Sequence, residues 1–244
     1  MTQGRPQRPA VPGLVPTLNN TGFMSEHVDA CSQAFIDHAA ACRGEVLDMG
    51  CAFGVATLAA LGRGARVLAC DIEPRHLDAV RARTDAADLP RLRTQVAALP
   101  QADFSTASFD AILCSRVVHF LRGPDIETAV GKFHAWLKPG GKLFLITDTP
   151  YSGYWKAHAP IYEEKKRAGD PWPGLIADTS IYLPAGATRS AGLLNPCDPD
   201  ILARVCTEAG FTITEAFFVG RRTTASDPAR PEGKDHAAVV AVKA

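Results

Sequence analysis

The most informative stretch of the sequence is Glu45-Val-Leu-Asp-Met-Gly-Cys-Ala-Phe-Gly-Val-Ala-Thr57. The apolar pair Val46-Leu47 leads into Asp48 and the glycines Gly50 and Gly54, and a helix-compatible run follows. This order predicts a buried strand, a tight turn and a helix. Because such a turn brings backbone N–H groups and a helix N-terminus close to a ligand, it predicts a nucleotide-like ligand.

The glycine spacing argues against a dinucleotide. The dinucleotide fingerprint is G-x-G-x-x-G, whereas Gly50, Ala52 and Gly54 occupy every second position and Val55 stands where the last glycine would fall. Asp48 places a carboxylate at the strand end. That carboxylate either organises the turn or meets a cationic amine.

Composition limits the classes of protein to consider. The chain has 244 residues, of which 46% are hydrophobic, so it can bury one sizeable core, as one large domain or two small ones. Its formal net charge of +0 gives no electrostatic reason to expect binding to nucleic acid or to an anionic membrane. The first 22 residues hold no apolar signal segment, and no 18-residue apolar run occurs. We therefore expect a cytoplasmic protein that is neither secreted nor membrane-spanning.

The cysteines and the N-terminal region carry further signals. Seven cysteines, with no C-x-x-C pair, predict reduced core residues. Four prolines among the first sixteen residues predict a flexible arm, which we assign to residues 1–24. Ser25 is a candidate N-cap for a helix that ends at Gly44, and residues 25–244 are assigned to one domain.

Strand and helix patterns alternate after the glycine-rich turn. Strands are expected at Arg66–Asp71, Leu92–Ala97, Phe109–Cys114 and Lys142–Thr147, with helices over Pro74–Arg83 and Asp125–Leu137. This alternation predicts a parallel sheet with right-handed crossovers, in which ligands bind outside the carboxyl ends of the strands.

Asp71 ends the strand expected at Arg66–Asp71 and stands 21 residues after Gly50. A carboxylate at this place binds the ribose hydroxyls in doubly wound nucleotide sites. The alternative is a surface acid that caps the next helix.

Five segments in order now resemble the class I S-adenosylmethionine (SAM) dependent methyltransferases, particularly the small-molecule branch with the quinone-pathway enzymes. The segments are Asp48-Met-Gly-Cys-Ala-Phe-Gly54, Asp71-Ile72, Leu99-Pro100 with Ser108-Phe109-Asp110, Val117-Val-His-Phe-Leu121, and Leu137-Lys-Pro-Gly-Gly141. The resemblance covers about residues 46–147.

The resemblance implies an α/β fold: a doubly wound, Rossmann-like, seven-stranded sheet, mostly parallel with an antiparallel last strand. It places a helix at Asp198–Ala209, strands at Phe211–Val219 and Ala237–Val242, and an insertion after strand five at residues 148–196. It also implies SAM as the cofactor. The cofactor-binding residues would be Asp48, Gly50, Cys51, Ala52, Gly54, Asp71, Ile72, Gln95, Val96 and Ser115. Gln95 stands where the family usually has an adenine-binding Asp, and its amide oxygen can also accept.

His119 follows the fourth strand, where the methyl group of SAM would point. With an ordinary pKa of about 6.5, it is a candidate catalytic base for a hydroxyl acceptor. The alternative is that His119 only packs near the cofactor, as in other family members.

Aromatic residues concentrate in the insertion, which we interpret as a lid over the substrate. Tyr151, Tyr154, Trp155 and His158 are the candidate substrate-binding residues, because flat acceptors favour aromatic walls with a few polar groups. Alternatively, these side chains only fix the insertion to the sheet. No His, Cys or acidic cluster has metal-ligand spacing, so no metal is expected.

The function expected from these features is SAM-dependent methylation of oxygen or nitrogen in a small, aromatic or conjugated molecule, as in secondary metabolism. Methylation of a protein or a tRNA, a SAM-binding regulatory module without turnover, and an NAD-dependent oxidoreductase are the alternatives. The expected partner is a small methyl acceptor, with no nucleic acid or membrane, and the protein is expected to be a monomer or homodimer.

Overall fold

The computed structural model describes residues 13–182, 192–220 and 233–244, except for the side chain of Tyr154. Its strands are β1 (Leu14–Pro16), β2 (Phe23–Ser25), β3 (Glu45–Met49), β4 (Arg66–Asp71), β5 (Leu92–Val96), β6 (Phe109–Ser115), β7 (Leu137–Asp148), β8 (Phe211–Val219) and β9 (His236–Lys243). The α-helices are α1 (Ala30–Ala39), α2 (Val55–Leu61), α3 (Pro74–Arg83), α4 (Gly123–Trp136), α5 (Ala159–Arg167) and α6 (Pro199–Glu208). Short 3-10 helices are η1 (Leu89–Arg91), η2 (Val118–Phe120), η3 (Gly153–His158) and η4 (Thr179–Tyr182).

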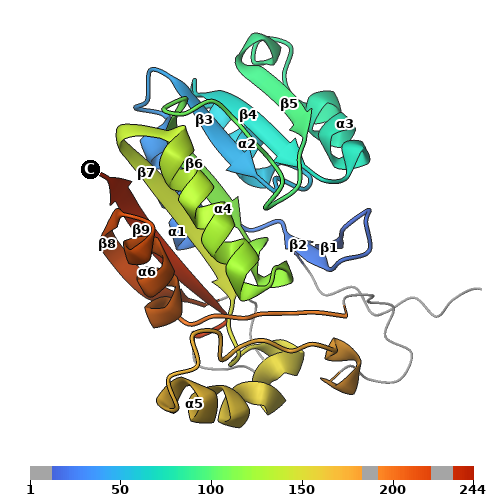
Figure 1. Ribbon diagram of the computed structural model, residues 1–244. Coiled ribbons are helices and arrows are strands. Elements are labelled where there is room, and N and C mark those ends of the chain that lie inside the picture. The colour runs from blue at the N-terminus through green and yellow to red at the C-terminus, as the bar shows by residue number, and fades with distance from the viewer. Residues whose placement is uncertain (1–12, 183–191, 221–232) are drawn as a thin grey trace, which may run out of the picture.

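A seven-stranded sheet with the order β5-β4-β3-β6-β7-β9-β8 forms the centre of the fold (Figure 1). The pairs from β5 to β7 are parallel, and β9 is antiparallel to both β7 and β8. The expected doubly wound sheet with an antiparallel last strand is confirmed. Strand order reverses between β3 and β6, which is where doubly wound sheets bind ligands.

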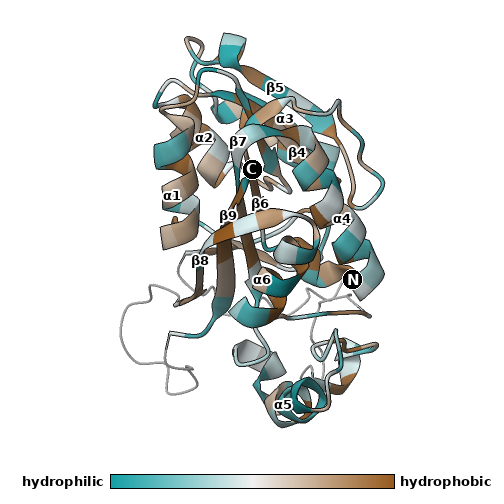
Figure 2. Ribbon diagram, turned by 60° about the vertical axis from the view of Figure 1, so that its left-hand side comes forward, coloured by the Kyte–Doolittle hydropathy of each residue, from teal (hydrophilic) through white to brown (hydrophobic). Residues whose placement is uncertain are grey.

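Helices cover both faces of the sheet because its central strands are apolar on both sides (Figure 2). On one face, Leu47 and Ile112 pack with Phe133 of α4 and Leu202 of α6. On the other, Val46 and neighbouring strand residues pack with α1, α2 and α3. Apolar side chains on both faces are typical of parallel strands that helices cover on both sides.

The N-terminal region differs from the expected arm. Residues 14–25 form a hairpin in which Leu14 pairs with Ser25, while residues 1–12 lie outside the described part. Ser25 therefore belongs to a strand and does not cap the helix. Asp29 caps α1 instead, since its carboxylate accepts from the Ser32 N–H at 2.9 Å.

The later elements follow the expected order. Asp198 caps α6 through the Ile201 N–H, β8 has the predicted bounds, and β9 extends one residue beyond the predicted strand at each end. The insertion after β7 contains η3, α5 and η4 and lies beyond the carboxyl edge of the sheet (Figure 1). All seven cysteines are free, and all except Cys42 are buried, as expected for core residues.

Candidate functional site

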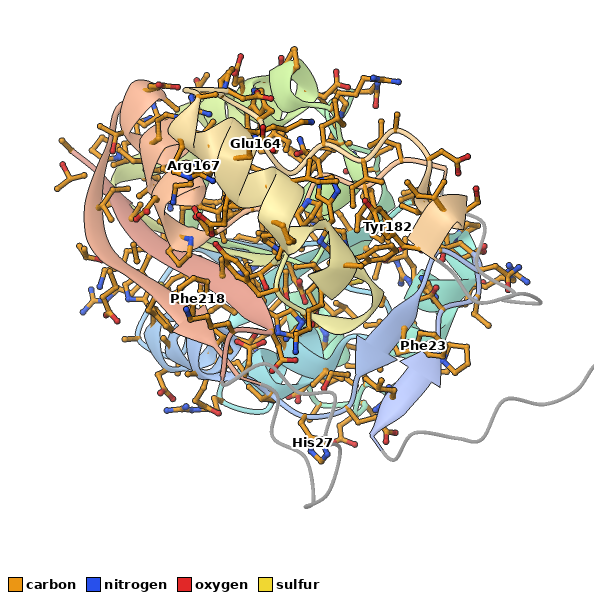
Figure 3. The ribbon with its side chains drawn as sticks, turned by 90° about the horizontal axis from the view of Figure 1, so that it is seen from below. Phe23, His27, Glu164, Arg167, Tyr182 and Phe218 are labelled. Carbon is orange, nitrogen blue, oxygen red and sulfur yellow. The ribbon has the colours of Figure 1, made fainter. Side chains whose placement is uncertain are left out.

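The carboxyl ends of β3, β4, β5 and β6 meet at one edge of the sheet and bring most of the predicted cofactor residues together. Figure 3 looks onto this edge, with the N-terminal hairpin and the insertion at its borders. Gly50, Asp71, Val96 and Ser115 come from four different strand ends, which lie side by side in the sheet.

The glycine-rich turn after β3 has an unusual backbone. Gly50, Ala52 and Gly54 have φ angles of 84°, 46° and 75°. A Cβ on Gly50 would come within 2.2 Å of a Val117 methyl carbon, so this position requires glycine for space as well as for its φ. The turn thus packs directly against the segment that follows β6.

The backbone N–H groups of this turn are mostly paired inside the protein. Gly50 and Cys51 donate to the Cys70 carbonyl, and Gly54 donates to the Cys51 carbonyl. The Ala52 N–H donates to the Asp71 carboxylate at 2.8 Å. The expectation of bare N–H groups facing a ligand is therefore wrong for these four, which leaves fewer donors in the turn for a phosphate group.

Asp48 lies beneath the turn and is only 3% exposed. Its Oδ2 accepts a hydrogen bond from the Thr57 hydroxyl at 2.6 Å, which connects the end of β3 to α2. Burial, with a smaller contribution from the charge of Asp71, raises the pKa of Asp48 to about 6 against the opposing Thr57 hydrogen bonds. Of the two roles considered for Asp48, the geometry supports organising the turn.

Asp71 is buried as well and already has three hydrogen-bond donors. Oδ2 accepts from Ala52 N, and Oδ1 accepts from Glu73 N at 2.9 Å and lies 3.0 Å from His76 Nδ1. A carboxylate offers roughly four acceptor positions, so one position on Oδ2 remains for a ligand hydroxyl. The sequence carries no local signal for this role of His76, because only folding brings its ring to Asp71.

Two large apolar side chains flank Asp71. Ile72 and Val96 are each 56% exposed, although most apolar side chains of the sheet are buried. Gln95, the predicted adenine acceptor, is also exposed on β5. The arrangement places two exposed apolar side chains beside a carboxylate, which fits a nucleoside base and its ribose.

Arg116, directly after β6, is a site residue that sequence reasoning missed. Its φ of 60° is left-handed, and its guanidinium donates to Ser115 Oγ at 3.0 Å, Asp29 Oδ2 at 2.8 Å and His236 Nε2 at 3.1 Å. Burial alone would raise the pKa of Asp29, but Arg116 and the Ser32 hydrogen bonds outweigh it and hold that pKa below its usual value. Ser115, a predicted cofactor residue, is thus fixed by Arg116.

His119 is 3% exposed and lies in η2, within the segment that follows β6. Its Nδ1 accepts the Asp148 N–H at 3.2 Å and lies 3.3 Å from Thr147 Oγ1. Since Nδ1 is an acceptor, the proton of the neutral ring is on Nε2. In this tautomer the ring acts as a hydrogen-bond donor at Nε2. Catalysis by His119 stays a prediction, and this geometry favours a donor over a base.

The aromatic residues of the insertion mainly pack against one another. Trp155 and His158 are 4% and 5% exposed, and Trp155 forms a small core with Ile176 and Leu194. His158 Nδ1 lies 2.8 Å from the Tyr182 hydroxyl. Tyr151 is half-buried and donates its hydroxyl to Glu163. The side chain of Tyr154, another predicted substrate-binding residue, lies outside the described part.

These contacts support a packing role for the insertion aromatics, while substrate binding by them stays a prediction. Within residues 13–182, 192–220 and 233–244, no group of three or more His, Cys, Asp or Glu side chains could hold a metal ion. Of the helices in the described part, none is both long and apolar enough to cross a membrane.

The part of the chain that forms this edge of the sheet is similar to known methyltransferases. Residues 46–141 match the family described as "Methyltransferase domain". The ubiquinone biosynthesis O-methyltransferase of Pseudomonas aeruginosa (strain UCBPP-PA14) is 30% identical over 114 residues, which cover 46% of this chain and 48% of that protein. The chain thus matches about half the length of its curated relatives.

Solved structures show the same fold over most of the chain. A SAM-dependent methyltransferase from Methanosarcina mazei has a TM-score of 0.63 at 17% identity, with 85% of this chain and 96% of that chain covered. The 1,6-didemethyltoxoflavin-N1-methyltransferase of Burkholderia thailandensis, with bound 1,6-didemethyltoxoflavin and S-adenosylhomocysteine, has a TM-score of 0.58 at 21% identity, with 88% and 79% covered.

Proposed function

We propose that this chain, of which residues 46–141 match a methyltransferase domain, transfers the methyl group of SAM to an oxygen or nitrogen atom of a small, aromatic or conjugated molecule. The observation that carries this proposal is the glycine-rich turn, in which four backbone N–H groups are paired and beside which two carboxylates are buried. A pyrophosphate finds few donors there and would be repelled by Asp48 and Asp71. A sulfonium or ammonium group would instead be attracted.

The residues present fit SAM at this edge. The remaining acceptor position of Asp71 would take a ribose hydroxyl, Ile72 and Val96 would flank the adenine, and Gln95 would accept from its amino group. The turn from Gly50 to Gly54 would lie along the methionine part. When bound, the cofactor supplies a methyl group activated by its sulfonium sulfur. The chain must then hold the acceptor in line, which can lower the barrier by about 7 to 11 kcal/mol at best.

The nature of the acceptor rests on two supports. The curated relatives are named O-methyltransferases, and one structural neighbour is named a 1,6-didemethyltoxoflavin-N1-methyltransferase. In addition, Phe23 of the hairpin and Ile181 of η4 are 44% and 70% exposed, on two segments that border the carboxyl edge (Figure 3). Exposed apolar side chains of this size suit an apolar, flat acceptor.

Calorimetric titration with S-adenosylhomocysteine (SAH), with NAD as the comparison ligand, tests the cofactor class. Micromolar binding of SAH and none of NAD supports the proposal, and the reverse overturns it. Transfer of labelled methyl from SAM to phenols, heteroaromatic amines and carboxylic acids then tests the activity. Binding of SAH without transfer to any nucleophile class would instead favour a regulatory module, and transfer only to a protein or a tRNA would identify a macromolecular substrate.

A further inference from the structure

The tip of the N-terminal hairpin is hydrogen-bonded to the start of α3 through both backbone polar groups of Leu18. The Leu18 N–H donates to His76 Nε2 at 3.0 Å, and the Leu18 carbonyl accepts from Arg75 Nη2 at 2.7 Å. Arg75 is in turn paired with Glu73, the N-cap of α3. The adjacent side chains of Arg75 and His76 thus hydrogen-bond both backbone polar groups of Leu18.

His76 links this hairpin residue to the predicted ribose carboxylate. The ring is 1% exposed, and its Nε2 accepts from Leu18, so the proton of the neutral ring is on Nδ1 and is donated to Asp71 Oδ1. The Phe53 ring, from the glycine-rich turn, packs edge-on against His76 with 4.8 Å between the ring centroids. One imidazole therefore contacts the hairpin, the turn and the carboxylate.

Part of the boundary between the hairpin and the domain is open rather than closely packed. A cavity of about 300 Å³ lies between Val15, Met24 and Glu26 on the hairpin side and Phe53, Val55, Leu58 and Arg83 on the domain side. An interface with a cavity of this size gains little from close packing. The position of the hairpin therefore depends strongly on the hydrogen bonds to Leu18.

We propose that His76 is a positioning residue that couples docking of the N-terminal hairpin to cofactor binding at Asp71. By holding Oδ1, His76 turns the carboxylate so that Oδ2 presents its remaining acceptor position to a ribose hydroxyl. Docking of Leu18 fixes the tautomer of His76 that can do this. Because coupling between two equilibria is reciprocal, cofactor binding must also tighten the docking of the hairpin.

This inference rests on the proposed function, and one residue allows it to be tested without altering the cofactor site. Leu18 occupies the second position of a turn closed by the Asn20 N–H to Thr17 carbonyl hydrogen bond of 3.1 Å. Proline is favoured there. Leu18→Pro removes the N–H that His76 accepts, whereas the matched control Leu18→Ala keeps the N–H and removes only the side chain.

Two measurements on the full chain decide the matter. We expect Leu18→Pro to raise the Kd for SAH by about fivefold or more relative to Leu18→Ala. We also expect SAH to slow hydrogen exchange of the hairpin amides in the unchanged protein and in Leu18→Ala, and to lose this effect in Leu18→Pro. His76→Asn, which can still donate to Asp71 but cannot reach Leu18, should resemble Leu18→Pro. A role in folding alone would not make hairpin exchange depend on SAH.

The coupling is overturned if Leu18→Pro binds SAH as tightly as Leu18→Ala, or if SAH leaves the hairpin exchange of the unchanged protein as it was. Failure of the proposed function looks different. In that case the unchanged, folded protein does not bind SAH at all, and the result appears before any variant is compared.

Discussion

The Thr57 hydroxyl donates a 2.6 Å hydrogen bond to Asp48, and both side chains are buried beneath the glycine-rich turn. This contact joins the end of β3 to α2 and so holds the two ends of the turn together. It also places a carboxyl group where charge is unfavourable, because burial raises its pKa from 3.8 to about 6.

Asp48→Asn should therefore stabilise the protein at neutral pH. The pKa of Asp48 is higher in the folded than in the unfolded protein. The free energy of unfolding is therefore not reduced by its ionisation below about pH 4, and it falls as the pH rises from there through 6. At pH 7 the difference amounts to about 3 kcal/mol. Urea unfolding without cofactor at pH 4.5 and 7.5 should show the advantage of Asp48→Asn growing with pH. The exposed Asp78→Asn serves as the control, and an advantage that does not change with pH would contradict the assignment.

Asp71→Asn should weaken SAH binding by about 1.5 to 3 kcal/mol, roughly 10- to 150-fold, because hydrogen bonds to a charged acceptor are lost. In the unchanged protein, backbone N–H groups donate to both carboxylate oxygens of Asp71. In the variant, the NH₂ group of the amide would face one of these donors. Calorimetric titration measures the change, again with Asp78→Asn as the control. Unchanged affinity in a folded Asp71→Asn protein would remove Asp71 from the cofactor site.

His119→Asn should separate the two roles considered for this histidine. The Asn amide oxygen can replace Nδ1 as the acceptor of the Asp148 N–H, but Asn cannot act as a base near neutral pH. If His119 is a donor or packs only, turnover at saturating acceptor should fall less than about tenfold and its pH profile should keep its shape. A general base contributes about 100- to 10,000-fold, so a loss of that size together with a lost titration step would establish the base.

Trp155→Phe should destabilise the protein without altering acceptor binding. Trp155 is 4% exposed and forms the small core of the insertion with Ile176 and Leu194, so a smaller ring leaves a void. We expect a loss of about 1 to 3 kcal/mol in the free energy of unfolding and an acceptor KM within about twofold of the original. A large rise in KM at unchanged stability would instead assign Trp155 to the acceptor site.

Local signals in the sequence predict the order of the elements and the edge of the sheet where the site lies. Apolar runs ending in Asp48 and Asp71, with Pro74 opening a helix, are local signals that act over a few residues. The bounds of β8, in contrast, were implied by the resemblance to a known family. The α1 cap could not be predicted, since Ser25 and Asp29 both suit that role and only pairing with Leu14 draws Ser25 into a strand.

The hydrogen-bond partners of the site residues, in contrast, depend on the tertiary structure. Asp71 shares its carboxylate with His76, which in turn accepts from Leu18, 58 residues away in the chain. Arg116 joins Asp29 and His236 from opposite ends of the sequence, and Asp148 fixes the tautomer of His119. No local pattern encodes such partners, because each hydrogen bond depends on side chains that folding alone brings within about 3 Å of one another.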